Sequence, residues 1–78
     1  MKKSLHTERQ QLLIVLLKDA RTTAGLTQQD VADGLGKPQS FVAKYENGER
    51  RLDIIELIDV AEVLDADPMK WINRLSSI

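Results

Sequence analysis

The chain has 78 residues, 42% of them hydrophobic, and a formal net charge of −1, which fits one small domain with a modest core. It contains no cysteine, which excludes disulfides and thiolate zinc sites and fits the reducing cytoplasm. The longest apolar run, Leu12 to Leu17, is too short for a membrane span, and the polar residues Glu8 to Gln10 interrupt any signal peptide. We therefore expect a soluble, cytoplasmic domain with no membrane segment.

Helix signals recur along the whole chain, and strand alternation is almost absent. Thr7 and Gln10 have the spacing of a capping box, which predicts a first helix over residues 8–24, ended by Gly25. Its inward stripe is expected to comprise Leu13, Leu16, Leu17, Ala20 and Ala24. Further apolar residues widen the stripe along one edge, namely Leu5, Leu12 and Val15. This width indicates either a deeply buried helix or a contact with a second subunit.

The second predicted helix is short. Thr27 is an N-cap residue, and Asp30 lies in the first turn, where a negative charge suits the helix dipole. These signals predict a helix over residues 28–35 that ends at Gly36. Gly34 is expected to loosen its last turn, because glycine is a weak helix former. The inward residues are expected to be Val31, Ala32 and Leu35.

A third helix is predicted over residues 38–46, because Pro38 suits the start of a helix and Gly48 stops it. Its inward residues are expected to be Val42 and Tyr45. Only the segment Gly36 to Pro38 joins it to the second helix, in the manner of a helix-turn-helix.

Two further helices complete the predicted fold. Asp53 and Glu56 have the spacing of another capping box, which predicts a fourth helix over residues 54–64. Its inward residues are expected to be Ile54, Leu57, Ile58, Ala61 and Leu64. A fifth helix, over residues 68–75, begins at a proline. Its apolar residues are Met69, Trp71, Ile72 and Leu75. The sequence therefore predicts one compact all-α domain of five helices over residues 1–78.

The charged residues are unevenly distributed. Every charged side chain from Asp53 to Asp67 is acidic. The basic residues lie elsewhere and include Lys37, Lys44, Arg50 and Arg51. One end of the molecule is therefore expected to be acidic and another to be locally positive. The net charge of −1 argues against a strongly electrostatic nucleic-acid binder.

Several turn, cap and core positions agree at once with one known family. Residues 25–32 (GLTQQDVA), then Leu35-Gly36, Val42 and Tyr45 to Gly48, resemble the lambda-repressor-like (Cro/repressor, XRE) family of transcription regulators. The match covers most of the chain. The resemblance implies a homodimer that binds double-stranded DNA without cofactor or metal. Its third helix would lie in the major groove, and its second helix would cross the DNA backbone.

In this family the outer face of the third helix contacts bases, and the matching residues here are Gln39, Ser40, Phe41, Ala43 and Lys44. Glutamine can pair at two points with adenine, serine tolerates several bases, lysine suits guanine acceptors, and alanine fits a thymine methyl group. Phe41 fits either a thymine methyl group or its own domain, and neither is favoured. Without the resemblance, the same residues would fit a merely solvated helix face.

The resemblance also implies contacts with the DNA backbone, which set register rather than sequence. Gln28, at the start of the second helix, would hold a phosphate and support Gln39. The other expected backbone contacts are Lys37, Asn47, Arg50 and Arg51. In related repressors an arginine of the first helix pairs with an acid at the end of the third, and the matching residues are Arg21 and Glu46. Such a pair would fix the angle of the reading helix.

A dimer contact is expected where the wide first helix meets the C-terminal helix. Its candidate residues are Leu12, Val15, Trp71, Ile72 and Leu75, for which core packing is the simplest alternative. A symmetric dimer would bind an inverted-repeat operator with its reading helices about 34 Å apart. Glu49 stands where many relatives carry a base, and Asp30 and Asp33 reduce the positive field. These departures predict moderate affinity, with about 3 phosphates neutralised per subunit.

The most consistent function is a small dimeric regulator, a repressor that competes with polymerase for an operator. An antitoxin that represses its own operon falls in the same class. The alternative is a helical protein-interaction module with a protein partner and weak DNA affinity, which the net charge and Glu49 support. We expect no enzyme and no metal site, because no nucleophile is paired with a base, His6 is the only histidine, and Gly34 to Lys37 lacks the spacing of a phosphate loop.

Overall fold

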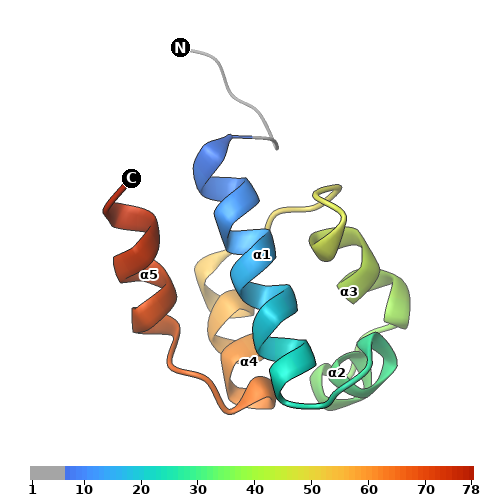
Figure 1. Ribbon diagram of the computed structural model, residues 1–78. Helices are drawn as coiled ribbons and strands as arrows, with labels where there is room; N and C mark the ends of the chain where they lie inside the picture. Colours follow the sequence, from blue (N-terminus) through green and yellow to red (C-terminus); the bar gives the residue numbers. More distant parts are fainter. Residues whose placement is uncertain (1–6) are drawn as a thin grey trace.

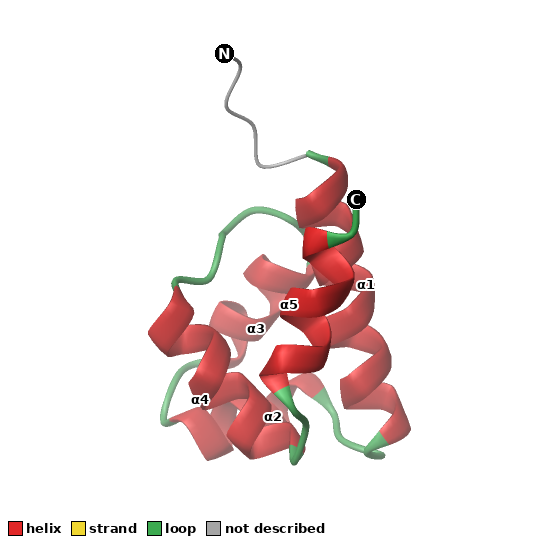
Figure 2. Ribbon diagram, turned by 90° about the vertical axis from the view of Figure 1, so that its left-hand side faces the viewer, coloured by secondary structure: helices red, strands yellow, loops and turns green. Residues whose placement is uncertain are grey.

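The computed structural model describes residues 7–78, which contain helices and no strand (Figures 1 and 2). The five helices are α1 (Glu8–Thr23), α2 (Gln28–Leu35), α3 (Gln39–Glu46), α4 (Ile54–Leu64) and α5 (Pro68–Ser76). The predicted all-α fold is therefore confirmed. Leu5 and His6 lie outside the described residues. Within residues 7–78 no helix combines the length and the apolar character that a bilayer crossing requires.

The helices begin and end where their capping residues lie. Thr27 and Asp30 form a complete capping box, in which the Asp30 amide donates to Thr27 Oγ1 over 3.0 Å and the Thr27 amide donates to Asp30 Oδ2 over 2.9 Å. The backbone hydrogen bond from Thr27 lowers the pKa of Asp30. Pro38 is the N-cap of α3 rather than its first residue, so α3 begins one residue later than predicted. Helix α1 ends one residue earlier than predicted, with Ala24 as its C-cap, and Gly25 follows at φ +74°.

One hydrophobic core joins the five helices. Its buried residues are Leu13, Leu17, Val31, Ala32, Val42, Tyr45, Leu57, Val60, Ala61, Leu64 and Trp71. Three predictions of inward residues are wrong, because Ala24 is exposed and Ile54 and Ile58 have exposed fractions of 55% and 41%. Helix α4 instead packs the face that includes Val60, so its first-turn isoleucines face solvent.

The arrangement places α3 and α5 on opposite sides of the molecule. Helix α2 packs against α3 and α4, α1 packs against both α3 and α5, and α5 also contacts α4. In Figure 1, α5 lies on one side of α1 and α4, and α2 and α3 lie on the other. The outer face of α3 is therefore far from the C-terminal helix.

Gly34 has a packing role that the sequence did not predict. Helix α2 continues through Gly34 to Leu35, as its predicted bounds require. A Cβ atom at Gly34 would lie 2.9 Å from Cγ1 of Val63, closer than two carbon atoms can approach without moving. Glycine therefore allows α2 to lie close to α4, which fixes the position of the turn that leads into α3.

Candidate nucleic-acid interface

Helices α2 and α3 form a helix-turn-helix. Gly36, at φ +67°, caps α2 in the left-handed region that favours glycine, and Pro38, two residues later, is the N-cap of α3. The turn leaves the first residues of α3 in solvent. Of the residues predicted to contact bases, Gln39, Ser40 and Lys44 are exposed, whereas Phe41 and Ala43 are partly buried. Of those predicted to contact the backbone, Lys37, Asn47 and Arg51 are exposed, and Gln28 and Arg50 are partly buried.

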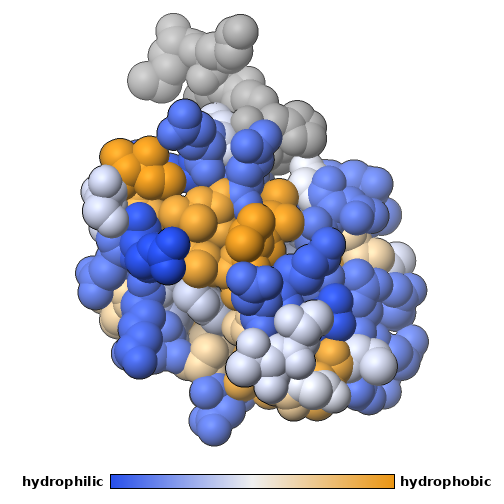
Figure 3. Space-filling view, in the orientation of Figure 1, coloured by the Kyte–Doolittle hydropathy of each residue, from blue (hydrophilic) through white to orange (hydrophobic). Residues whose placement is uncertain are grey.

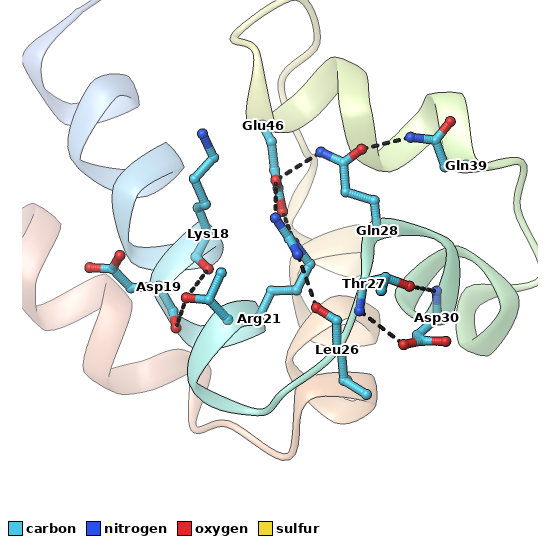
Figure 4. A network of polar contacts seen from close by, with 10 residues as sticks. Lys18, Asp19, Arg21, Leu26, Thr27, Gln28, Asp30, Gln39 and Glu46 are labelled. Atoms are coloured by element: carbon cyan, nitrogen blue, oxygen red, sulfur yellow. Dashed lines mark hydrogen bonds and ion pairs between the residues drawn. The ribbon is translucent and has the colours of Figure 1, made fainter.

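Arg21 of α1 and Glu46 at the end of α3 form the expected ion pair. Nε of Arg21 lies 2.7 Å from Oε2 of Glu46, and Nη2 lies 3.0 Å from Oε1. The Glu46 side chain is only 1% exposed. The hydrogen bond to Glu46 raises the pKa of Arg21, and Nη1 of Arg21 also donates to the carbonyl of Leu26 over 2.9 Å. The pair therefore ties α1 and the start of the α1–α2 turn to the last turn of α3 (Figure 4).

The ion pair continues outward through two glutamines to the surface of α3 (Figure 4). Nε2 of Gln28 donates to Oε1 of Glu46 over 3.0 Å, and Oε1 of Gln28 accepts from Nε2 of Gln39 over 2.6 Å. A carboxylate in an ion pair can only accept hydrogen bonds, so Gln28 must turn its amide nitrogen toward Glu46. Its oxygen then faces Gln39. The buried carboxylate thereby determines which end of the Gln39 amide faces inward.

Phe41 lies between two cations at the edge of α3. Its ring makes an edge-on contact with Tyr45, at 5.7 Å between centroids. Nζ of Lys37 lies 5.4 Å from the ring centroid, and Cζ of Arg50 lies 4.7 Å from it. Tyr45 belongs to the core, and burial raises the pKa of its phenol. Phe41 therefore packs against side chains of its own chain.

Arg50 is engaged within the chain by the first turn of α4. Its Nη1 and Nη2 atoms donate to the two carboxylate oxygens of Glu56 over 2.9 and 2.7 Å, and Nη1 also donates to the carbonyl of Arg51 over 3.0 Å. The hydrogen bond from Arg50 lowers the pKa of Glu56 to about 2. From the sequence, Glu56 was expected only to cap α4, and Arg50 was expected to contact a phosphate. One residue lies in a loop and the other in the first turn of a helix, and no spacing rule predicts an ion pair between two such positions.

The residues predicted for a dimer contact differ in exposure. Trp71 is only 6% exposed and belongs to the core, so it offers little surface to a second subunit. Val15 is 52% exposed, and the other three candidates, Leu12, Ile72 and Leu75, are partly buried. Figure 3 shows an apolar area on the face that carries α1 and α5. Among residues 7–78, no group of acidic or histidine side chains is arranged to hold a metal ion.

We predict that Arg21→Met lowers the free energy of unfolding by about 3 kcal/mol, because it leaves the buried Glu46 carboxylate unpaired. Arg50→Met is the matched control. It breaks the more exposed pair with Glu56 and should cost much less stability, because solvent screens exposed ion pairs. The double variant Arg21→Met/Glu46→Met removes both charges and should recover much of the lost stability. Urea unfolding measures all three, and equal losses for Arg21→Met and Arg50→Met would contradict the prediction.

Comparison with known proteins agrees with this geometry. A family model described as helix-turn-helix matches residues 17–71. An XRE-family like protein from Pseudomonas syringae pv. tomato str. DC3000 is 47% identical, with a TM-score of 0.86 over 92% of this chain and 88% of that protein. The restriction-modification controller protein C.AhdI from Aeromonas hydrophila is 27% identical, with a TM-score of 0.74 over 80% of this chain and 94% of that protein.

A third solved structure has a similar fold at lower identity. It is the restriction-modification controller protein C.Esp1396I, a tetramer in complex with its natural 35 base-pair operator. It is 19% identical, with a TM-score of 0.79 over 92% of this chain and 95% of that protein. A search of curated proteins gave no match. The family match and the 47% identical structure show that the chain belongs to the lambda-repressor-like, XRE-type helix-turn-helix family of DNA-binding transcription regulators.

Proposed function

We propose that the protein is a dimeric repressor that acts in the cytoplasm and binds an inverted-repeat operator with α3 in the major groove. The proposal rests on the series of hydrogen bonds that runs from Arg21 through Glu46 and Gln28 to Gln39. These bonds hold the exposed Gln39 side chain of α3 in one orientation, in which it can contact a base. The similarly folded controller protein solved with its operator supports DNA binding by this architecture. No cofactor is needed for such a mechanism.

The donor and acceptor directions in this series of hydrogen bonds determine which groups of Gln39 remain available to DNA. One amide hydrogen of Gln39 is used by Gln28, which leaves the carbonyl oxygen and the second amide hydrogen available. An oxygen acceptor beside an N–H donor matches adenine, which presents the N6 amino group and the N7 acceptor in the major groove. Ser40 and Lys44 lie exposed on the same short helix. Gln28 and the exposed residues Lys37, Asn47 and Arg51 are proposed to hold the backbone.

Selection of bound duplexes from a random DNA pool tests this proposal. We predict that the wild-type protein enriches an inverted repeat with adenine at one position of each half-site, and that Gln39→Ala/Lys44→Ala enriches none. Lys70→Ala is the control, because Lys70 is exposed on α5, on the opposite side from α3. The salt dependence should correspond to about 3 phosphates per subunit. If the folded wild-type protein enriches no duplex, the protein-interaction module is favoured. The next experiment would then be a search for a protein partner of the antitoxin type.

Two apolar surfaces are candidates for the dimer contact. The first is the surface of α1 and α5 predicted from the sequence. The second lies at the start of α4, where Ile54, Ile55 and Ile58 are 55%, 64% and 41% exposed. Their spacing of i, i+1 and i+4 places the three isoleucines on one side of the helix.

The position of α3 favours the α4 surface. Two reading helices must enter successive major grooves about 34 Å apart. A dimer through α5 would place both reading helices on the outer sides of the pair, away from the contact, since α5 and α3 lie on opposite sides of the molecule (Figure 1). The start of α4 follows directly after the loop that leaves α3. We therefore propose the isoleucines of α4 as the principal dimer contact.

Two matched substitutions distinguish these surfaces. Ile55→Asp and Val15→Asp each place a charge at a strongly exposed apolar position, so neither should unfold the monomer. We predict that Ile55→Asp is a monomer in sedimentation equilibrium and binds the operator at least tenfold more weakly, because two half-sites are no longer linked. Val15→Asp should remain a dimer. The reverse pattern would assign the contact to α1 and α5.

A further inference from the structure

We infer that Arg50, held by Glu56, is a positioning residue for the reading helix and not a phosphate contact. The inference rests on the proposed DNA-binding function and assigns a role to a basic residue that lies at the edge of the same surface. Glu46 lies in the last turn of α3, and Phe41 lies in its first turn. The Arg50–Glu56 pair links the loop after α3 to the start of α4, and Arg50 also contacts the Phe41 ring.

The end-on pair of Arg50 nitrogens, Nη1 and Nη2, is already bound to a carboxylate, which leaves the Nε hydrogen and one Nη2 hydrogen. Nη1 and Nη2 bind the two oxygens of Glu56 in the parallel geometry that arginine also uses for phosphate. The same guanidinium carbon lies 4.7 Å from the Phe41 ring centroid, within the range of a cation–π contact. A phosphate could bind Arg50 only by displacing Glu56 or by using the remaining hydrogens next to the Glu56 carboxylate, where the two negative charges repel each other.

Glu56 is itself fixed in place. It is the third residue of α4, and its Oε1 accepts from the Asp53 amide over 2.9 Å, while its own amide donates to Asp53 Oδ1 over 2.7 Å. The carboxylate that holds Arg50 is thus part of the capping box of α4. The path from the start of α4 through Glu56 and Arg50 to Phe41 then ends on α3, two residues beyond Gln39.

The two ion pairs act on opposite ends of α3. Glu46 and Arg21 hold the last turn of α3 against α1, whereas Phe41, through Arg50, links its first turn to α4. A rigid element held at both ends keeps its side chains in one place relative to the groove. Losing the Arg50 contact should let the first turn of α3 move, and with it Gln39 and Ser40.

Two substitutions distinguish a positioning role of Arg50 from a phosphate contact, and one of them conserves a charge whereas the other neutralises one. Arg50→Lys keeps the positive charge but cannot bind a carboxylate at two points. Glu56→Gln keeps an acceptor for the helix cap but removes the charge that holds Arg50. If Arg50 positions α3, both variants should bind the selected duplex about tenfold more weakly, the lower end of what one base contact contributes. For Arg50→Lys, which keeps the charge, binding to a nonspecific duplex and the salt slope should stay as in the wild type.

A phosphate role predicts the opposite. Arg50→Lys would then bind like the wild type, and Glu56→Gln would bind both duplexes more tightly, because it releases a cation and removes a negative charge. Arg51→Met provides the comparison for a backbone contact. It should weaken both duplexes alike and reduce the salt slope by about one ion.

A measurement without DNA tests the geometry separately. NMR titration of Glu56 should give a pKa of about 2 in the wild type and a higher pKa in Arg50→Met, which still falls below the ordinary value because the Asp53 amide keeps its hydrogen bond to Glu56. A Glu56 that titrates alike in both proteins would overturn the inference. Wild-type binding that prefers no duplex would overturn the proposed function and this inference with it. Selective wild-type binding that Arg50→Lys retains in full would overturn this inference alone.

Discussion

The buried carboxylate of Glu46 is the group on which the surface of this protein depends. Arg21 binds it at two points from α1, and Gln28 binds it from the start of α2. Three helices therefore meet at one anion, which is compensated by hydrogen bonds on both oxygens. Such a pair contributes little net stability but strongly penalises any other arrangement. Its main consequence is orientation, because an anion that only accepts hydrogen bonds sets the direction of every amide beyond it.

Function follows from holding a short helix at both ends. With eight residues, α3 would be unstable alone, so its angle depends on its neighbours. The Arg21–Glu46 pair and the close approach at Gly34 fix it relative to α1, α2 and α4. On the proposed account, Arg50 adds a link to the same helix that carries the exposed isoleucines. Dimer contact and reading helix would then share one rigid support.

Local signals predicted the helices well, because caps act within a few residues. Thr27 and Asp53 begin helices where expected, and Gly25 follows α1 as a left-handed glycine. The rotation of α4 could not be predicted in this way. Its apolar positions are more numerous than the buried face needs, so periodicity alone did not decide that Ile54 and Ile58 would be exposed. The Arg50–Glu56 pair likewise depends on the path of a loop, which no spacing rule describes.

The family resemblance supplied the Arg21–Glu46 pair and the link from Gln28 to Gln39, which composition and periodicity do not indicate. On the proposed mechanism, this buried pair determines a base preference at the surface of α3. Duplex selection with Arg21→Met/Glu46→Met tests that claim most directly, because Glu46 is too deeply buried to touch DNA. We predict a folded protein that loses the adenine preference at one position of each half-site and keeps its other preferences. Base preferences identical to those of the wild type would contradict the account.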